Sequence, residues 1–169
     1  MMAMKRAGLN DETSGNASIR HANGFYISRT GPITKSKPIF IGTEHPQASC
    51  EWRMHLQIYR ELMGVNAIIH FHGLPLDKDP IIDNPAQEAS QQLANQVGDA
   101  FHRLNTDTVF LKGHGNVVVG YSMETLIERV ESGEFKQKKS RWHFCQRPSC
   151  PREDHLIAFL YSEILWLLK

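Results

Sequence analysis

Three histidines carry the strongest chemical signal in the sequence. His70 and His72 stand two positions apart at the end of an apolar run, and side chains with that spacing project from one face of a strand, so both imidazoles can reach one metal ion. His114 follows a second apolar run and lies between Gly113 and Gly115, which allow a tight turn and an open approach to the ring. Three imidazoles without a thiolate leave one coordination position open, as in catalytic zinc sites.

Each of these signals also has a structural interpretation. A His-x-His pair at the end of a strand can be a hydrogen-bonded structural pair, and a histidine between glycines can simply occupy a hairpin turn. Histidine is nevertheless in excess, with 9 residues in 169, and neutral imidazole is the commonest metal ligand in proteins. We therefore expect one metal site built from all three, with zinc as the first expectation and manganese, iron or cobalt as alternatives.

Glu51 is the natural acid–base partner of such a site. It follows Ser49 and Cys50 at the start of a predicted helix, and the free N–H groups of a helix N-terminus bind anions. One helix end could thus hold a phosphate beside a carboxylate, although Glu51 could also be a surface residue that complements the helix dipole. His55, one turn later, is expected to pack or to support the site rather than to bind metal.

The elements that position these residues alternate along the chain. Strands are expected at 25–28, 39–41, 65–72, 108–111 and 117–119, and the Gly/Ser/Asn-rich segment 13–18 is expected to supply turns. Helices are expected from Ser49, Asn84 and Ser122, the two serines as N-caps, and an apolar helix is expected from about residue 154. Interleaved strands and helices favour α/β layers over a helix bundle or a β-sandwich.

Composition excludes several classes of protein. The length of 169 residues, 41% of them hydrophobic, predicts one globular domain over 1–169. A net charge of +1 provides no basic surface for nucleic acid. The most apolar stretch, 156–168, is too short to span a bilayer, and no secretory signal is recognisable. Three cysteines, an odd number, indicate a reducing cytoplasm rather than a disulfide framework.

Six short segments, in their order along the chain, carry a family resemblance. They are residues 8–10, 13–20, 24–31, 49–55, 66–72 and 114–115. Over residues 8–132 this joint pattern resembles the class II aldolase/adducin family, whose enzymes include fuculose-1-phosphate aldolase, ribulose-5-phosphate 4-epimerase and methylthioribulose-1-phosphate dehydratase. The resemblance implies a three-layer α/β/α fold around a mixed, mostly antiparallel sheet. It also implies a homotetramer or other homo-oligomer with sites between neighbouring subunits.

The resemblance also implies roles for individual residues. The metal ligands would be His70, His72 and His114, and Glu51 would be the catalytic glutamate, moving a proton at a substrate carbon and working best with its pKa raised by burial. The residues that would bind a substrate phosphate are Asn16, Thr30, Gly31, Ser49 and Cys50, the last standing where a second serine is usual.

The implied activity is metal-dependent aldol cleavage or condensation of a small phosphorylated ketose. A glutamate at position 51 favours aldol cleavage or dehydration, since an aspartate there is more typical of the epimerases. An epimerase or dehydratase on the same metal site remains an alternative, and so does an adducin-like scaffold without catalytic activity.

The sequence departs from the family pattern in three places. Only eight residues precede Leu9, where the family normally has a full helix. Only 42 positions separate His72 from His114, fewer than in the aldolases, which points to a changed substrate pocket. The tail 133–169 is divergent, and there His143, Cys145, Cys150 and His155 could form a second, structural zinc site or simply pack. Tyr121 and Tyr161 are candidates for the proton donor that a neighbouring subunit supplies in the family aldolases.

Overall fold

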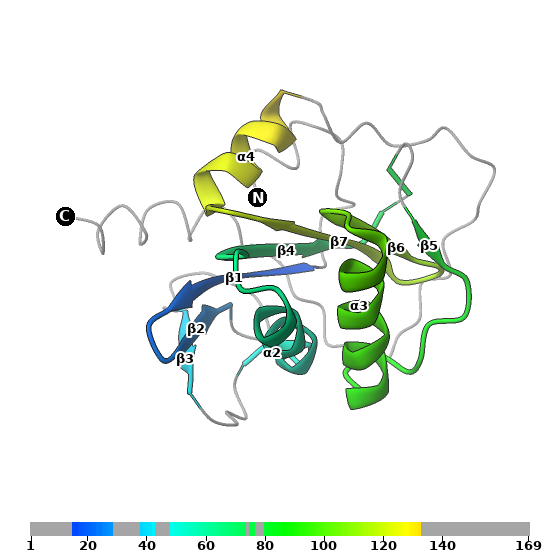
Figure 1. Ribbon diagram of the computed structural model, residues 1–169, viewed down its shortest axis with the longest axis horizontal. Helices are drawn as coiled ribbons and strands as arrows, with labels where there is room; N and C mark the ends of the chain where they lie inside the picture. The colour runs from blue at the N-terminus through cyan, green and yellow to red at the C-terminus, as the bar shows by residue number, and fades with distance from the viewer. Residues whose placement is uncertain (1–14, 29–37, 43–47, 74, 77–79, 133–169) are drawn as a thin grey trace.

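A seven-stranded mixed sheet forms the centre of the computed structural model, which describes residues 15–28, 38–42, 48–73, 75–76 and 80–132. Its strand order is β3-β2-β1-β4-β7-β6-β5 (Figure 1). Neighbouring strands pair antiparallel except β5 and β6, which pair in parallel. The strands are β1 (Gly15–His21), β2 (Gly24–Ile27), β3 (Ile39–Ile41), β4 (Ala67–Phe71), β5 (Ile81–Ile82), β6 (Thr108–Leu111) and β7 (Gly115–Gly120).

Helices cover both faces of the sheet. Helices α2 (Trp52–Glu61) and α3 (Gln91–Leu104) lie against each other on one face, and α4 (Met123–Glu131) lies on the other (Figure 1). The main core fills the space between the sheet and the first two helices, with Phe25, Ile58, Ile68, Leu93, Val97, Phe101 and Val117 among its buried members. This arrangement confirms the predicted three-layer α/β/α fold around a mostly antiparallel sheet.

The prediction that residues 13–18 supply turns is wrong for the part of this segment that the structure describes. Residues from Gly15 onward form β1, which lies inside the sheet between β2 and β4. Its small residues permit close packing, since a Cβ at Gly15 would lie 2.6 Å from the backbone oxygen of His70. Asn16 and Ser18 alternate onto the face that carries α2, so these polar side chains point toward the helix rather than into a turn.

Helix α2 begins later than its sequence indicates. Its N-cap is Glu51, whose side chain makes no capping hydrogen bond, and Ser49 is not the cap. The backbone N–H of Ser49 donates to the Ser28 carbonyl (3.1 Å), and the Trp52 N–H donates to the Ser49 carbonyl (3.0 Å). Ser49 therefore belongs to a turn tied to the end of β2, and the Glu51 carboxylate is left for other contacts.

Helix α3 also begins later than the Asn84 predicted for it. Its N-cap is Ser90, whose hydroxyl accepts a hydrogen bond from the Leu93 N–H (3.0 Å). The helix cannot extend further back because Ala89 has a φ of 60°, in the left-handed region. The start of α4 does follow the prediction, with the Ser122 hydroxyl accepting from the Thr125 N–H (3.2 Å).

Within the described residues, no helix has both the length and the apolar character needed to cross a bilayer.

Candidate metal and acid–base site

The fold brings His70, His72 and His114 together. His70 lies near the end of β4, and His72 follows that strand directly. His114 precedes β7, which pairs with β4. One ring nitrogen from each histidine lies within 4.8 Å of the others, and the ring centroids are 4.9–5.2 Å apart. His70 and His114 are buried, while His72 is partly exposed. His72 is therefore the most exposed of the three histidines.

Glycine at position 115 allows this approach of the two strands. Its φ is +143°, and a Cβ there would collide with the backbone of Phe71 and His72. Gly113, on the other side of His114, has a φ of +78° in the turn. Both glycines thus adopt the backbone conformations of the tight turn that the sequence predicts. This turn places the His114 ring beside the β4 histidines.

The carboxylate of Glu51 faces the same histidines. Its Oε1 lies 2.6 Å from Nε2 of His114, and its Oε2 lies 3.2 Å from Nε2 of His70. Asn16, the β1 neighbour of His70, donates from Nδ2 to Oε2 of Glu51 (2.8 Å). Glu51 is only 5% exposed, so its position at the N-cap of α2 places a buried carboxylate against the cluster.

The charges of this group are strongly coupled. Burial raises the pKa of Glu51, but His70 and His114 outweigh that effect and hold the pKa well below its usual value. The upward shift predicted from burial alone is therefore wrong. Burial lowers the pKa of His70 to about 3 and also lowers that of His72, whereas the nearby Glu51 raises the pKa of His114 in spite of its burial.

The donor set around His70 fits a bound cation. Its Nδ1 lies 2.9 Å from the backbone oxygen of Asn116, and because a carbonyl only accepts, Nδ1 must carry the hydrogen. Nε2 then presents a lone pair to the Glu51 carboxylate, so two buried acceptors face each other at 3.2 Å. A positive charge between them removes this repulsion.

The spacing of the three histidines allows a metal ion with a small inward movement. Nitrogens on a tetrahedral zinc ion lie about 3.4 Å apart, compared with the 4.8 Å limit found here. The bond from His70 to the Asn116 carbonyl is the kind of outer contact that fixes the tautomer of a metal-binding imidazole.

A second polar layer lies behind the carboxylate. The hydroxyl of Ser18 is 2.6 Å from Nδ1 of His55 and 2.8 Å from the hydroxyl of Tyr59. All three residues are buried, and burial lowers the pKa of His55 to about 4. His55 thus supports the packing of α2 against β1 and does not join the histidine cluster, in line with its sequence interpretation; Ser18 carried no signal of its own.

The predicted phosphate-binding residues are placed only in part. Ser49 is fully buried with its N–H donated to Ser28, Cys50 is partly exposed beside it, and Asn16 is bonded to Glu51. Thr30 and Gly31 lie outside the described residues. The same is true of the tail residues that could hold a second metal or donate a proton, namely His143, Cys145, Cys150, His155 and Tyr161.

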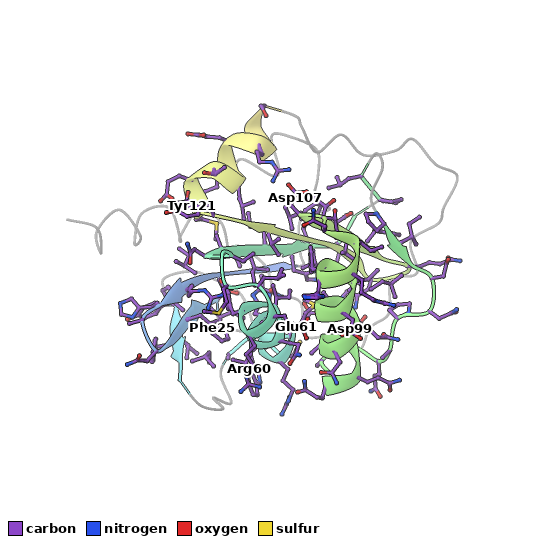
Figure 2. The ribbon with its side chains drawn as sticks, in the orientation of Figure 1. Phe25, Arg60, Glu61, Asp99, Asp107 and Tyr121 are labelled. Carbon is purple, nitrogen blue, oxygen red and sulfur yellow. The ribbon has the colours of Figure 1, made fainter. Side chains whose placement is uncertain are left out.

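Tyr121 is described, but it lies far from the cluster of its own chain. It follows the last residue of β7, whereas His114 precedes the first, and the six residues between them span roughly 20 Å. Figure 2 shows it beside the start of α4, and its side chain is 77% exposed.

Sequence reasoning missed a second carboxylate near the cluster. Oε1 of Glu88 lies 3.8 Å from Nδ1 of His114. Glu88 stands in the shortened interval between His72 and His114, where no motif marks it, and a single acidic residue before a helix is an ordinary surface feature.

Comparison with known proteins finds a family model that matches the first part of the chain. Residues 1–75 match the family model of the Class II Aldolase and Adducin N-terminal domain. The chain is 31% identical over 108 residues to L-fuculose phosphate aldolase of Escherichia coli O6:H1 (strain CFT073), covering 59% of this chain and 50% of that protein. It therefore spans about half the length of that relative.

Two further relatives extend the match. An L-fuculose phosphate aldolase of Methanococcus maripaludis (strain C7) is 30% identical over 151 residues, which cover 70% of this chain and 79% of that protein. The crystal structure of l-fuculose-1-phosphate aldolase from Thermus thermophilus superposes with a TM-score of 0.56 at 24% identity, covering 78% of this chain and 89% of that one. The structural match supports the fold.

Proposed function

Because the chain belongs to the class II aldolase and adducin family, we propose that it is a metal-dependent lyase that cleaves and forms a carbon–carbon bond in a small phosphorylated ketose. The observation that carries this proposal is the buried Glu51 carboxylate held against His70 and His114. The relatives named L-fuculose phosphate aldolase favour aldol chemistry over epimerisation or dehydration on the same site.

The three histidines would hold the metal, for which we propose zinc. His70 would bind through Nε2, because its Nδ1–H is committed to the Asn116 carbonyl. His114 would also bind through Nε2, because this nitrogen faces the same Glu51 carboxylate as Nε2 of His70 does. When bound, an ion with three neutral ligands would act as a Lewis acid that polarises the substrate carbonyl and stabilises negative charge on its oxygen.

Glu51 would be the acid–base group. Its two carboxylate oxygens face the cluster, and it would move the proton to and from the substrate carbon next to the carbonyl. Asn16 holds the carboxylate by its hydrogen bond to Oε2, which restricts the rotation of the side chain. Because Glu51 is buried, the proton would pass between carboxylate and substrate in a site of low dielectric.

The phosphate of the substrate would lie at the turn before α2. We propose that Ser49 and Cys50, together with Thr30 and Gly31, surround it, since this turn places polar groups directly beside Glu51. Asn16 can take part as well. Its Nδ2 group donates to Glu51 and carries a second hydrogen, which we propose is donated to a phosphate oxygen.

We also propose that the protein works as a homo-oligomer. The exposed phenol of Tyr121 cannot reach the cluster of its own chain, but it is available to a neighbouring subunit as a proton donor. Molar mass by light scattering, combined with the activity of Tyr121→Phe, tests this assignment. A monomer with full activity would contradict it.

The activity is tested by incubating the zinc-loaded protein with dihydroxyacetone phosphate and a panel of short aldehydes. Condensation is expected, and Glu51→Gln is expected to lower its rate by about 10²–10⁴-fold, the usual effect of removing a general acid–base group. Glu124→Gln is the matched control, because Glu124 is an exposed carboxylate on α4. Its rate should equal that of the wild type.

Three results would count against the proposal. Undiminished condensation in Glu51→Gln would show that the base is misassigned. Epimerised or dehydrated products from a panel of ketose phosphates, without condensation, would favour the alternative enzymes. Absence of any turnover in a protein that binds zinc would favour a scaffold role.

A further inference from the structure

Glu88 lies beside the histidine cluster on the side opposite Glu51. Its Oε1 is 3.8 Å from Nδ1 of His114, and its charge also acts on His72. The side chain is 37% exposed, whereas the His114 side chain beside it is 5% exposed. A surface carboxylate thus meets a buried imidazole at the one ring nitrogen that does not face the candidate metal position.

The backbone around Glu88 is held from both sides. The N–H of Ser90 donates to the Gln87 carbonyl (3.2 Å), which closes a turn around Glu88 and Ala89. On the far side of the turn, the Ala86 N–H donates to the side-chain oxygen of Gln96 on α3 (2.7 Å). These hydrogen bonds fix the segment to α3 and hold the backbone of Glu88 in one position.

This turn contains a strained residue. Ala89 has a φ of 60°, a left-handed conformation that is unfavourable for a residue with a Cβ. Such conformations persist where the surrounding structure enforces them, and they gather at functional sites. The strained residue directly follows Glu88 and turns the chain so that this carboxylate reaches His114.

The two nitrogens of His114 have different environments. Nε2 faces the Glu51 carboxylate, and Nδ1 faces Glu88. His70 shows the same division, with Nδ1 bonded to the Asn116 carbonyl and Nε2 turned into the cluster. Each of these two imidazoles thus has an acceptor behind it, a backbone carbonyl in one case and a carboxylate in the other.

We propose that Glu88 is a positioning residue for the metal site: its carboxylate accepts the Nδ1–H of His114 and so fixes the ring with Nε2 directed at the ion. This inference rests on the proposed metal site. An acceptor on the second nitrogen of a metal-binding histidine orients the ring and makes it a stronger ligand, an effect of about 10–100-fold in metal affinity. A rotation of the partly exposed Glu88 side chain shortens 3.8 Å to the roughly 2.8 Å of a charge-assisted hydrogen bond.

The experiment measures zinc affinity by competition with a chelator for the wild type and three variants. Glu88→Ala removes the acceptor, and its affinity should fall by about 10–100-fold. Glu88→Gln keeps an oxygen that can accept the Nδ1–H but lacks the charge, so its loss should be smaller. Glu124→Gln is the control, because Glu124 is an exposed carboxylate on α4, and this variant should bind zinc as the wild type does.

A second readout follows the ring hydrogen itself. In ¹H–¹⁵N spectra of zinc-free protein, the Nδ1–H of His114 should be protected from solvent exchange in the wild type and in Glu88→Gln. In Glu88→Ala the signal should broaden or disappear. Because this readout needs no metal, it reports on the contact between Glu88 and His114 even if the proposed function is wrong.

The outcomes separate the two proposals. A wild type that binds zinc with the same affinity as Glu88→Ala, and the same His114 signal in both, overturns the role of Glu88 and leaves the metal site standing. A wild type without zinc affinity overturns the metal site. In that case the Nδ1–H signal alone decides whether Glu88 holds the His114 ring.

Discussion

The buried imidazole of His55 makes a quantitative prediction about stability. His55 is fully buried on α2, where Ser18, Tyr59, Glu51 and the more distant His70 surround it. Burial lowers the pKa of His55 from 6.5 to about 4, so the folded protein holds the ring neutral while the unfolded chain takes up a proton. The stability linked to this ring is complete above pH 6.5 and is lost as the pH falls toward 4.

The size of the effect follows from these two values. Each pKa unit corresponds to about 1.4 kcal/mol, so the shift of His55 can remove at most about 3 kcal/mol from the free energy of unfolding. Between pH 7 and pH 5 the loss is about 2 kcal/mol, because most of the unfolded chains are protonated at pH 5 and the folded ring is not.

The assay compares the wild type with His55→Asn. The asparagine amide occupies the position of Nδ1 and can keep the bond to Ser18, but it does not titrate. Urea unfolding of both zinc-free proteins at pH 7 and pH 5 gives the difference in their unfolding free energies. Other titrating groups are common to both proteins and cancel in this difference.

The wild type should be the more stable protein at pH 7, and its advantage should shrink by about 2 kcal/mol at pH 5. An advantage that stays constant across this range would refute the reasoning. It would mean that His55 is protonated in the folded protein or accessible to water.

Two further predictions concern stability. Ser18→Ala removes the shared hydrogen-bond partner of His55 and Tyr59 and should lower the free energy of unfolding, measured in urea, by about 2–4 kcal/mol. A loss below about 1 kcal/mol would show that these groups find other partners. Leu126 is fully buried on α4 against Gly120, so Leu126→Ala should lower the free energy of unfolding by about 2–5 kcal/mol without changing zinc affinity. A large change in zinc affinity would mean that α4 supports the cluster.

The sequence predicted those parts of the site that depend on local periodicity. Alternation along a strand places His70 and His72 on one face, and the glycines beside His114 predict the tight turn in which Gly113 has a φ of +78°. Strands β2, β3, β4, β6 and β7 and helix α4 were likewise found near their predicted positions.

The parts that depend on tertiary contacts were not predictable in this way. Gly15, Asn16 and Ser18 have turn-forming types, yet they form a central strand because their small size permits close strand packing and their polar groups meet α2. The pKa of Glu51 falls because two histidines distant in sequence lie against it, which outweighs the burial that its sequence position suggests.

The contact between Glu88 and His114 was likewise not predictable from the sequence. The position of Glu88 depends on the turn closed by Ser90 and on the left-handed conformation of Ala89. Alanine rarely adopts this conformation, so the sequence does not predict it. Only the folded backbone brings this carboxylate to His114.

The central claim, that His70, His72 and His114 hold one divalent ion, is tested most directly by measuring bound zinc per chain. Protein saturated with zinc and then dialysed should retain one equivalent, and His70→Ala should retain almost none, while Glu124→Gln should match the wild type. A wild type that retains no zinc, or a His70→Ala variant that still retains one equivalent, would contradict the claim.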